Sequence, residues 1–578
     1  MQESRTVLSK KIGYFVFILI GSVFVFFWMT QKDLAEQENI LWTGSYVARL
    51  LGISLFVGAL LGGTLCFFLY ALAEGVWRKL LFRENSLFRD ARRVGVRLEG
   101  LGIGKVYLFS FLLIALSWIP TYLAYYPAIC AYDAPIQVGQ AVEDYLVDHH
   151  PLVHTLLIRG FIYLGRGVFG DVNVGIGIYA VLQLLFLSAA FAYGIAALHR
   201  FHVRPLWQVL ALLYCMFYPF HWYMSVTVTK DTVFTGFVVV MMVSMCELLL
   251  EGRNDLRVKG RDVLLFVAVM GVILFRNNGK YALMVMLVIL FLALIVGRTT
   301  RRLWARILGN VLVAFLLGNV ILSAVFTLSG AEQGDRREML SMPIQQLART
   351  MIYHGGVGVL PEDDDTMEDV DRALINDFLL DEAYRWYDAD LADPVKAHTN
   401  TYVVRYRYED FFSTYFHLLS EYPGDFINAG LAVNAGYLYP NDVSHAYINE
   451  QEGLVGRGYV QTYWFEADLV PRGIYKDSKW ESLREALESW ADRNAYLYLP
   501  VLKYIFVPGT YLYLYLILAG YLLIRREWRM LVPLAFVLGH YITLFLGPTV
   551  QLRYLYPVMV GWPFMALLHG KFENSAKG

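Results

Sequence analysis

Residues 125–171 hold a group of side chains that could do acid/base chemistry. The carboxylates and imidazoles here are more closely spaced than in the other apolar parts of the chain, and they are Asp133, Glu143, Asp144, Asp148, His149, His150 and His154. A carboxylate can accept a proton from a reacting hydroxyl group. Asp133 is therefore the candidate catalytic residue, although an Asp before Ala134 and Pro135 is also a good helix N-cap.

The adjacent His149 and His150 allow more than one interpretation. They precede Pro151, so they could bind a substrate, cap a helix or contact lipid headgroups. Neighbouring side chains point in different directions on a regular backbone, which makes the two imidazoles a weak pair of metal ligands. If a metal binds, Asp133, Asp148 and His149 are its candidate ligands; the cofactor is unknown and a divalent cation stays open.

Three cations at the ends of apolar segments form a second group. Lys230, Arg276 and Arg553 are candidates for binding an anionic phosphate, because Arg can hold phosphate oxygens with two hydrogen bonds and Lys supplies a point charge. Asn277 and Tyr554 follow two of these cations directly and are included as substrate-binding candidates.

Each cation also has a simpler interpretation. Lys230 could pair with the next residue, Asp231, while Arg276 could extend to lipid headgroups and Arg553 could face water. The recurrence of cations at three separate helix ends favours a shared phosphate site.

The segment 341–349 adds two polar candidates. Pro343 can start a helix that places Gln346 and Arg349 on one face, three residues apart. We include both as substrate-binding residues, with an ordinary polar helix face as the alternative.

The composition indicates the kind of protein that must position these residues. The chain has 578 residues, of which 57% are hydrophobic and 17% charged, so it is more apolar than soluble proteins usually are. Its net charge of -1 argues against a nucleic-acid partner. The four Cys residues form no CxxC pair.

Hydropathy predicts about twelve transmembrane helices, each near the length that crosses a bilayer. The expected spans are 12–29, 46–72, 105–124, 172–198, 206–222, 232–250, 262–275, 281–297, 304–328, 497–523, 529–546 and 554–569. We expect the first to be a retained helix and not a cleaved secretory signal.

Basic loops assign the sides of the membrane. The stretch 76–105 carries eight cations and should be cytoplasmic by the positive-inside rule: Arg78, Lys79, Arg83, Arg89, Arg92, Arg93, Arg97 and Lys105. Alternation of the spans then places both termini in the cytoplasm and residues 125–171 and 330–496 on the outer side. We expect the protein to lie in the plasma membrane. The second segment has 30 Asp and Glu against 14 Lys and Arg, which suits an aqueous face.

These elements predict an all-α polytopic membrane protein in four parts. Residues 1–104 form two helices and a basic loop, 105–329 a membrane core that contains the outer loop 125–171, 330–496 a mainly α outer domain, and 497–578 three final helices. Within the outer loop, 134–147 and 151–165 are apolar helices too short to span, and such helices lie in the membrane interface.

Six short passages resemble the GT-C superfamily of polytopic glycosyltransferases, and within it a group of mostly Gram-positive bacterial membrane proteins. They are YPAICAYD at 126–133, DHHPLVHT at 148–155, TKD at 229–231, FRNNG at 275–279, MPIQQLAR at 342–349 and RYLYP at 553–557. The resemblance implies a GT-C-like fold, with the helices in 1–104 as an N-terminal addition. It also implies that Asp133 lies near the reacting centre. Relatives often have two acidic residues in sequence there, whereas Ala134 follows Asp133.

The implied activity is transfer of a sugar from a polyprenyl-phosphate donor to an acceptor outside the cell membrane, such as a surface glycan or a protein, with inversion in one displacement. Two other functions stay open. Twelve helices also suit a transporter or flippase of lipid-linked or small polar solutes, although ionisable residues near one surface do not match the usual mid-bilayer transport site. A noncatalytic protein that binds a wall polymer is the third option.

Overall fold

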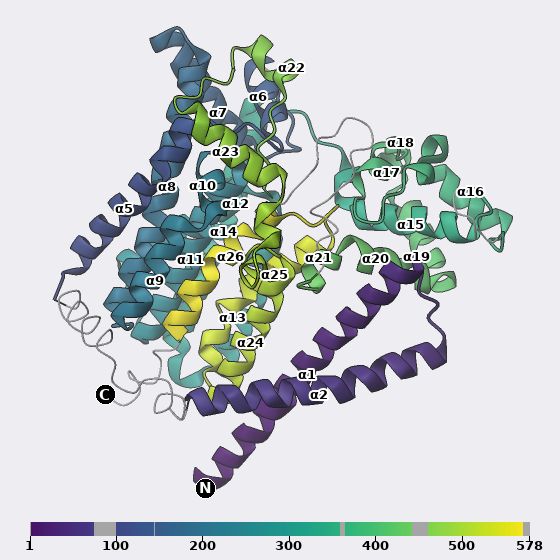
Figure 1. The fold of residues 1–578 in the computed structure, drawn as a ribbon, viewed down its shortest axis with the longest axis horizontal. Coiled ribbons are helices and arrows are strands. Elements are labelled where there is room, and N and C mark those ends of the chain that lie inside the picture. Colours follow the sequence, from purple (N-terminus) through teal and green to yellow (C-terminus); the bar gives the residue numbers. More distant parts are fainter. Residues whose placement is uncertain (1, 74–99, 144, 359–364, 442–459, 570–578) are drawn as a thin grey trace.

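The computed structural model describes residues 2–73, 100–143, 145–358, 365–441 and 460–569. Throughout these ranges the chain is built from helices joined by loops, with isolated bridges in place of strands (Figure 1). The predicted all-α fold is confirmed. The cations at 76–97 and Asp144 fall outside the described ranges.

Nine helical segments of the described chain are long and apolar enough to cross a membrane. They correspond to α1 (Gln2–Gln37), α2 (Gly44–Ala73), α5 (Ile103–Ala124), α7 (Leu152–Leu164) with η1 (Gly165–Phe169), α8 (Val172–Arg200), α11 (Lys230–Glu251), α13 (Asn277–Val296), α14 (Arg301–Ser329) and η9 (Trp528–Leu531) with α25 (Leu534–Phe545). The pair α9 (Pro205–Phe217) and α10 (Pro219–Val226) makes a tenth if its 52° bend lies within one span. The chain is thus a polytopic α-helical membrane protein.

The twelve predicted spans differ from this set at four places. Length and composition do not mark α12 (Gly260–Phe275), α24 (Gly509–Arg525) or α26 (Leu552–His569) as crossings among the described residues. The first two have 16 and 17 residues, and α26 contains two prolines. Conversely, α7 with η1 meets the requirement although its residues were predicted to lie in the interface.

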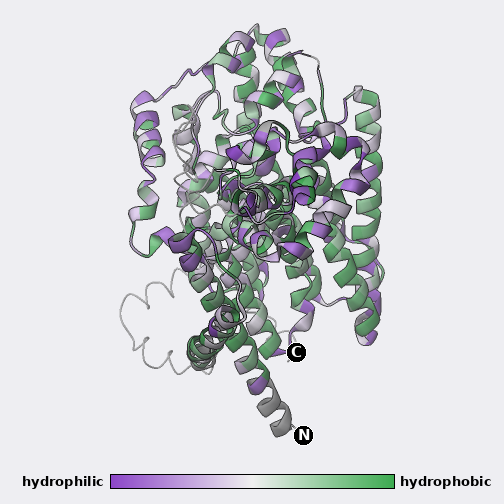
Figure 2. Ribbon diagram, turned by 90° about the vertical axis from the view of Figure 1, so that its right-hand side faces the viewer, coloured by the Kyte–Doolittle hydropathy of each residue, from purple (hydrophilic) through white to green (hydrophobic). Residues whose placement is uncertain are grey.

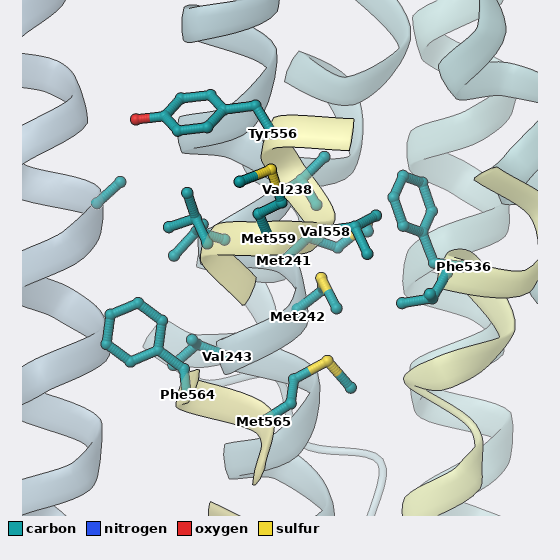
Figure 3. Packing of buried hydrophobic residues seen from close by; sticks show 14 of the residues in the cluster. Val238, Met241, Met242, Val243, Phe536, Tyr556, Val558, Met559, Phe564 and Met565 are labelled. Carbon is teal, nitrogen blue, oxygen red and sulfur yellow. The ribbon is translucent and has the colours of Figure 1, made fainter. Parts of the chain in front are cut away.

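α11 is the centre of the helical bundle. It packs against α8, α12 and α26, and 89% of its most apolar stretch is buried inside the protein. Close approach is possible because Gly561 of α26 faces Met242 of α11, where an added Cβ would lie 3.0 Å from the sulfur. Figure 3 shows the valine and methionine side chains of α11 among side chains of α25 and α26.

Most residues of the long helices are apolar (Figure 2), and in α1, α2, α5, α13 and α14 about a third or less of the apolar stretch is buried. Such a surface is suited to lipid.

Residues 330–496 divide into two parts in the structure. The first is a lobe at one side of the bundle, formed by α15 (Ser341–His354), α16 (Asp369–Phe378), α17 (Asp393–Ala397), α18 (Thr401–Tyr406), α19 (Tyr408–Glu421) and α20 (Pro423–Val433) (Figure 1). The short α21 (Ala435–Leu438) follows α20 and packs on α24 of the bundle. The second part holds α22 (Glu466–Leu469) and α23 (Glu481–Asp492), which pack on α6 (Ala134–Glu143) and α5 respectively. The second part therefore covers the loop that carries Asp133.

Both ends of α7 contact the same end of the bundle. His154 near its start lies beside Phe275 at the end of α12, with 6.4 Å between ring centroids. Gly165 at its end lies against Gly175, within the first turns of α8. α6 packs on α7.

Candidate functional site: a buried ion cluster at one end of the bundle

The loop that presents Asp133 is fixed to the segment before α11. Ile129 donates its N–H to the carbonyl of Val226 and accepts from the N–H of Val228, at 2.9 and 2.8 Å. Tyr132 then takes a positive φ of 58°, which a bulky residue seldom adopts without support from its surroundings. That support comes from Tyr463, whose hydroxyl accepts from the Tyr132 N–H at 3.1 Å. Two separate contacts thus place Asp133 beside the start of α11.

The first turn of α11 sends two neighbouring ionisable residues to different partners. Thr229 caps the helix by accepting from the Asp231 N–H at 3.3 Å. Successive helical residues point about 100° apart. Lys230 therefore reaches Asp133, with 2.5 Å between Nζ and Oδ2, whereas Asp231 turns inward and pairs with Arg276.

Arg276 lies in the short break between α12 and α13. Gly279 makes this break tight, because a Cβ there would meet the Val272 carbonyl oxygen at 2.5 Å. The guanidinium group of Arg276 also lies over the ring of Tyr554, 4.8 Å from its centroid. The break therefore holds a buried cation beside Asp231 and Tyr554.

Arg553, at the start of α26, bridges the two carboxylates. Its Nη1 donates to Asp133 at 2.9 Å and lies 3.4 Å from Asp231. Its Nε donates to Gln551 at 2.7 Å, and its guanidinium carbon lies 4.3 Å from the ring centroid of Tyr132. Two carboxylates, an amide and an aromatic ring thus fix the orientation of the Arg553 guanidinium group.

The cluster of Asp133, Lys230, Asp231, Arg276 and Arg553 carries three positive and two negative charges. Asp231 is fully buried, while Asp133 keeps 22% of its side-chain surface exposed. Burial alone would raise the pKa of Asp133, but the charges of Arg553 and Lys230 outweigh burial and hold that pKa well below its usual value. Asp133 is thus an ionised carboxylate that remains partly accessible to solvent.

A neutral imidazole completes one side of the cluster. His150 Nδ1 lies 3.2 Å from Lys230 Nζ. Burial, together with the charge of Lys230, holds the pKa of His150 well below its usual value. His150 therefore accepts a hydrogen bond from Lys230 and helps to orient it.

A buried polar chain continues behind His150. His154 contacts Gln137 at 3.0 Å and Tyr179 at 2.7 Å, and Tyr179 donates to Gln183 at 2.7 Å. Gln183 donates in turn to the carbonyl of Thr227 at 2.8 Å. This chain ties α6, α7 and α8 to the segment before α11, so it stiffens the frame around Asp133.

The metal candidates are not brought together. Asp148 accepts from the backbone N–H of Gly334 at 2.5 Å, next to a bridge between Val147 and Glu332. His149 is exposed, and its ring stacks edge-on against His150 with centroids 4.4 Å apart. Within the described ranges, no group of three His, Cys, Asp or Glu side chains is arranged to hold a metal ion. Asp148 instead fastens the outer loop to the start of the lobe.

Gln346 and Arg349 lie away from the cluster, so the structure does not place them with the other candidates. Gln346 donates to the Phe426 carbonyl at 2.9 Å and accepts from Tyr415 at 2.8 Å, inside the lobe. Arg349 donates to the Glu38 carbonyl at 2.6 Å and to the Tyr387 hydroxyl at 2.9 Å. Arg349 thus connects the lobe to the turn between α1 and α2.

The remaining candidates lie where the sequence suggested. Tyr554 accepts from Arg553 Nη2 at 3.0 Å, and Asn277 begins α13 beside Arg276 with its side chain exposed. The simpler interpretations of the cations are excluded by geometry, because Lys230 pairs with Asp133 and both arginines are buried. The carboxylate of Asp133 likewise contacts cations and not the N-terminus of α6.

Three contributors were not singled out from the sequence: Asp231 as the partner of two arginines, Tyr132, and Gln551. Asp231 could have been found, since an Asp flanking the start of a long apolar helix needs a cation nearby. Tyr132 and Gln551 carry no comparable signal.

Fold and site together define a polytopic α-helical membrane protein with a buried, partly accessible ion cluster at one end of its bundle. The chain belongs to a family of unknown function, DUF6020, whose model matches residues 138–577. The matched region contains Lys230, Asp231, Arg276 and Arg553 and begins just after Asp133. No curated protein and no solved structure matches the chain.

Proposed function

We propose that this protein is a membrane glycosyltransferase that moves a sugar from a polyprenyl-phosphate donor to an acceptor on the extracytoplasmic side, with a GT-C-like fold. The observation that carries the proposal is the pairing of the accessible carboxylate of Asp133 with Lys230 and Arg553. A base and phosphate-binding cations must lie within one sugar's width of each other for this reaction, and here they are in direct contact.

The reaction follows from those positions. The donor phosphate binds Lys230 and Arg553, with Arg276 behind them. Asp133 accepts the proton of the acceptor hydroxyl as its oxygen forms a bond to the anomeric carbon. The bond from that carbon to the phosphate oxygen breaks, and the bonding electrons leave with the polyprenyl phosphate. The fixed cations stabilise the charge that grows on this leaving group, and one displacement inverts the anomeric carbon.

The apolar surroundings suit a lipid-linked donor. α7 has both ends at the cluster end of the bundle, and we place it with α6 in the outer membrane interface. A polyprenyl chain in the bilayer could then bring its phosphate to the cluster at the level of the headgroups. The positive-inside rule supports this orientation, with the cluster outside and both termini in the cytoplasm.

The pH dependence of transfer should separate the free protein from the donor complex. In the free protein the pKa of Asp133 is held well below its usual value, so kcat/KM should stay constant down to that range. A bound phosphate adds negative charge beside Arg553, Lys230 and the neutral His150, and the pKa of Asp133 rises. We expect the acid limb of kcat at a higher pH than the acid limb of kcat/KM. An acid limb of kcat at the same pH or lower would contradict this coupling.

Reconstitution tests the proposed activity directly. The purified protein in liposomes should transfer label from a polyprenyl phosphate that carries radiolabelled glucose, galactose, mannose or N-acetylglucosamine to extracted surface glycan. Movement of a solute or of the lipid-linked sugar across the bilayer, without transfer to any acceptor, would instead establish a transporter or flippase. Glycan binding without turnover would establish a noncatalytic role.

A further inference from the structure

A cavity of about 390 Å³ lies between α12 and α14 at the end of the bundle opposite to the Asp133 cluster. α12 begins at this end with Gly260 and reaches the cluster only where it ends, before Arg276. The volume is within the range of about 300–1,000 Å³ that small-molecule sites have. The cavity is therefore large enough to bind a ligand and is separate from the site described above.

The walls of the cavity are mostly apolar. Val263 and Phe266 of α12 face Val313 of α14, and the loop before α12 adds Leu256 and Val258. Those two loop residues are 63% and 66% exposed, and they continue the apolar surface formed by α12 and α14. The cavity thus offers a surface that an acyl chain can cover.

The polar side of the cavity has hydrogen-bonding capacity to spare. The side chain of Arg306 is 3% exposed. Its Nη1 donates to Asp255 at 3.0 Å, and its Nε lies 3.2 Å from Oδ1 of the buried Asp262. Its Nη2 is buried and has no hydrogen-bond partner within the described chain, and the same holds for Oδ1 of Asn310. Buried polar groups of native proteins are nearly always paired, so a donor without a partner at a cavity wall points to a ligand.

The charge around the cavity specifies the sign of that ligand. Residues 252–262 and 301–306 contain seven Lys and Arg, of which Arg253, Arg261 and Arg306 pair with nearby carboxylates. Arg301 and Arg302, at the start of α14, are exposed. Arg257 and Lys259 in the connecting loop are exposed. A positive rim over an apolar groove between α12 and α14 fits a headgroup phosphate above an acyl chain.

We propose that this cavity binds an anionic phospholipid from the leaflet at that end of the bundle. A phosphate oxygen accepts from Nη2 of Arg306 and lies near the loop cations, while one acyl chain lies along α12 and α14 between Val263 and Val313. An apolar tail and an anionic head together explain both sides of the cavity, which free phosphate does not.

Gly309 provides a variant that blocks the cavity without disturbing the fold. It lines the cavity on α14, and a Cβ added there meets no atom within 4 Å. Gly309→Leu therefore fills open space. Gly104→Leu is the matched control, because Gly104 lies in the first turn of α5 and is equally open.

The test measures lipid retained by the full-length protein after purification from vesicles of phosphatidylglycerol and phosphatidylcholine. We expect the wild-type protein and Gly104→Leu to retain phosphatidylglycerol selectively, and Gly309→Leu to retain about tenfold less, which corresponds to about 1.4 kcal/mol. Equal retention by Gly309→Leu, or no preference for phosphatidylglycerol in the wild-type protein, would overturn the proposal.

Arg257→Gln gives a second reading that does not depend on filling the cavity. It removes one exposed rim cation, so the preference for phosphatidylglycerol should fall while total bound phospholipid stays near the wild-type amount. An unchanged preference would count against the proposal even if Gly309→Leu proved unstable.

Discussion

Asp133→Asn should lower the rate of sugar transfer by about 10²–10⁴-fold, the usual contribution of a positioned general base. The amide is nearly the same size as the carboxylate, so donor binding should survive better than turnover. A transfer assay at saturating donor measures this loss in kcat. The same substitution removes one negative charge from beside Lys230 and Arg553, which should strengthen their attraction for phosphate and lower the KM for the donor.

Glu143→Gln is the matched control for this prediction. Glu143 lies in the same outer loop, but it is exposed and pairs with Arg472 instead of the cluster. Transfer should stay at the wild-type rate. Equal rates for the wild-type protein and Asp133→Asn would remove Asp133 from the chemistry, and an equal loss in both variants would indicate a general effect of charge in the loop.

The sequence predicted the helical membrane fold because hydropathy depends on each segment alone. A run such as 232–250 is apolar whatever it packs against, and the structure has α11 there. Prediction was poorer where packing decides. The segment 151–165 was predicted as a helix too short to span, and the structure extends it through η1 to Phe169. Its length then reaches that of a span, but both of its ends contact the same end of the bundle, so length alone does not decide its placement.

The sequence predicted which residues form the site better than it predicted which side chains each of them contacts. Lys230, Arg276 and Arg553 stand at helix ends, which hydropathy locates, so their convergence could be expected. Arg349 lies inside α15 and bonds to Glu38, more than 300 residues away. Spacing along the chain carries no information on that distant contact. The balance of charge in the cluster also depends on Asp231, which pairs with Arg276 and Arg553. Its side chain points into the protein because Thr229 caps α11 and so fixes the start of the helix.

Asp231→Leu should be among the most destabilising single changes in the protein. It leaves the buried guanidinium of Arg276 without its carboxylate and removes one of the two carboxylates near Arg553. Removing one partner of a buried ion pair typically costs about 3–5 kcal/mol, because the remaining charge stays out of water without compensation. Unfolding of the purified protein in detergent, followed by heat or denaturant, measures the loss.

The double variant Asp231→Leu with Arg276→Leu separates stability from function. Replacing both members of a buried pair by apolar residues is often close to neutral, so the double variant should recover much of the stability that the single variant loses. Its rate of sugar transfer should still be below that of the wild-type protein, since a phosphate-binding cation is gone. Failure of the second substitution to restore stability would mean that Asp231 is held mainly by Arg553 or by the helix start. Recovery of both stability and transfer would mean that Arg276 has no part in binding the donor, and the phosphate site would then consist of Lys230 and Arg553 alone.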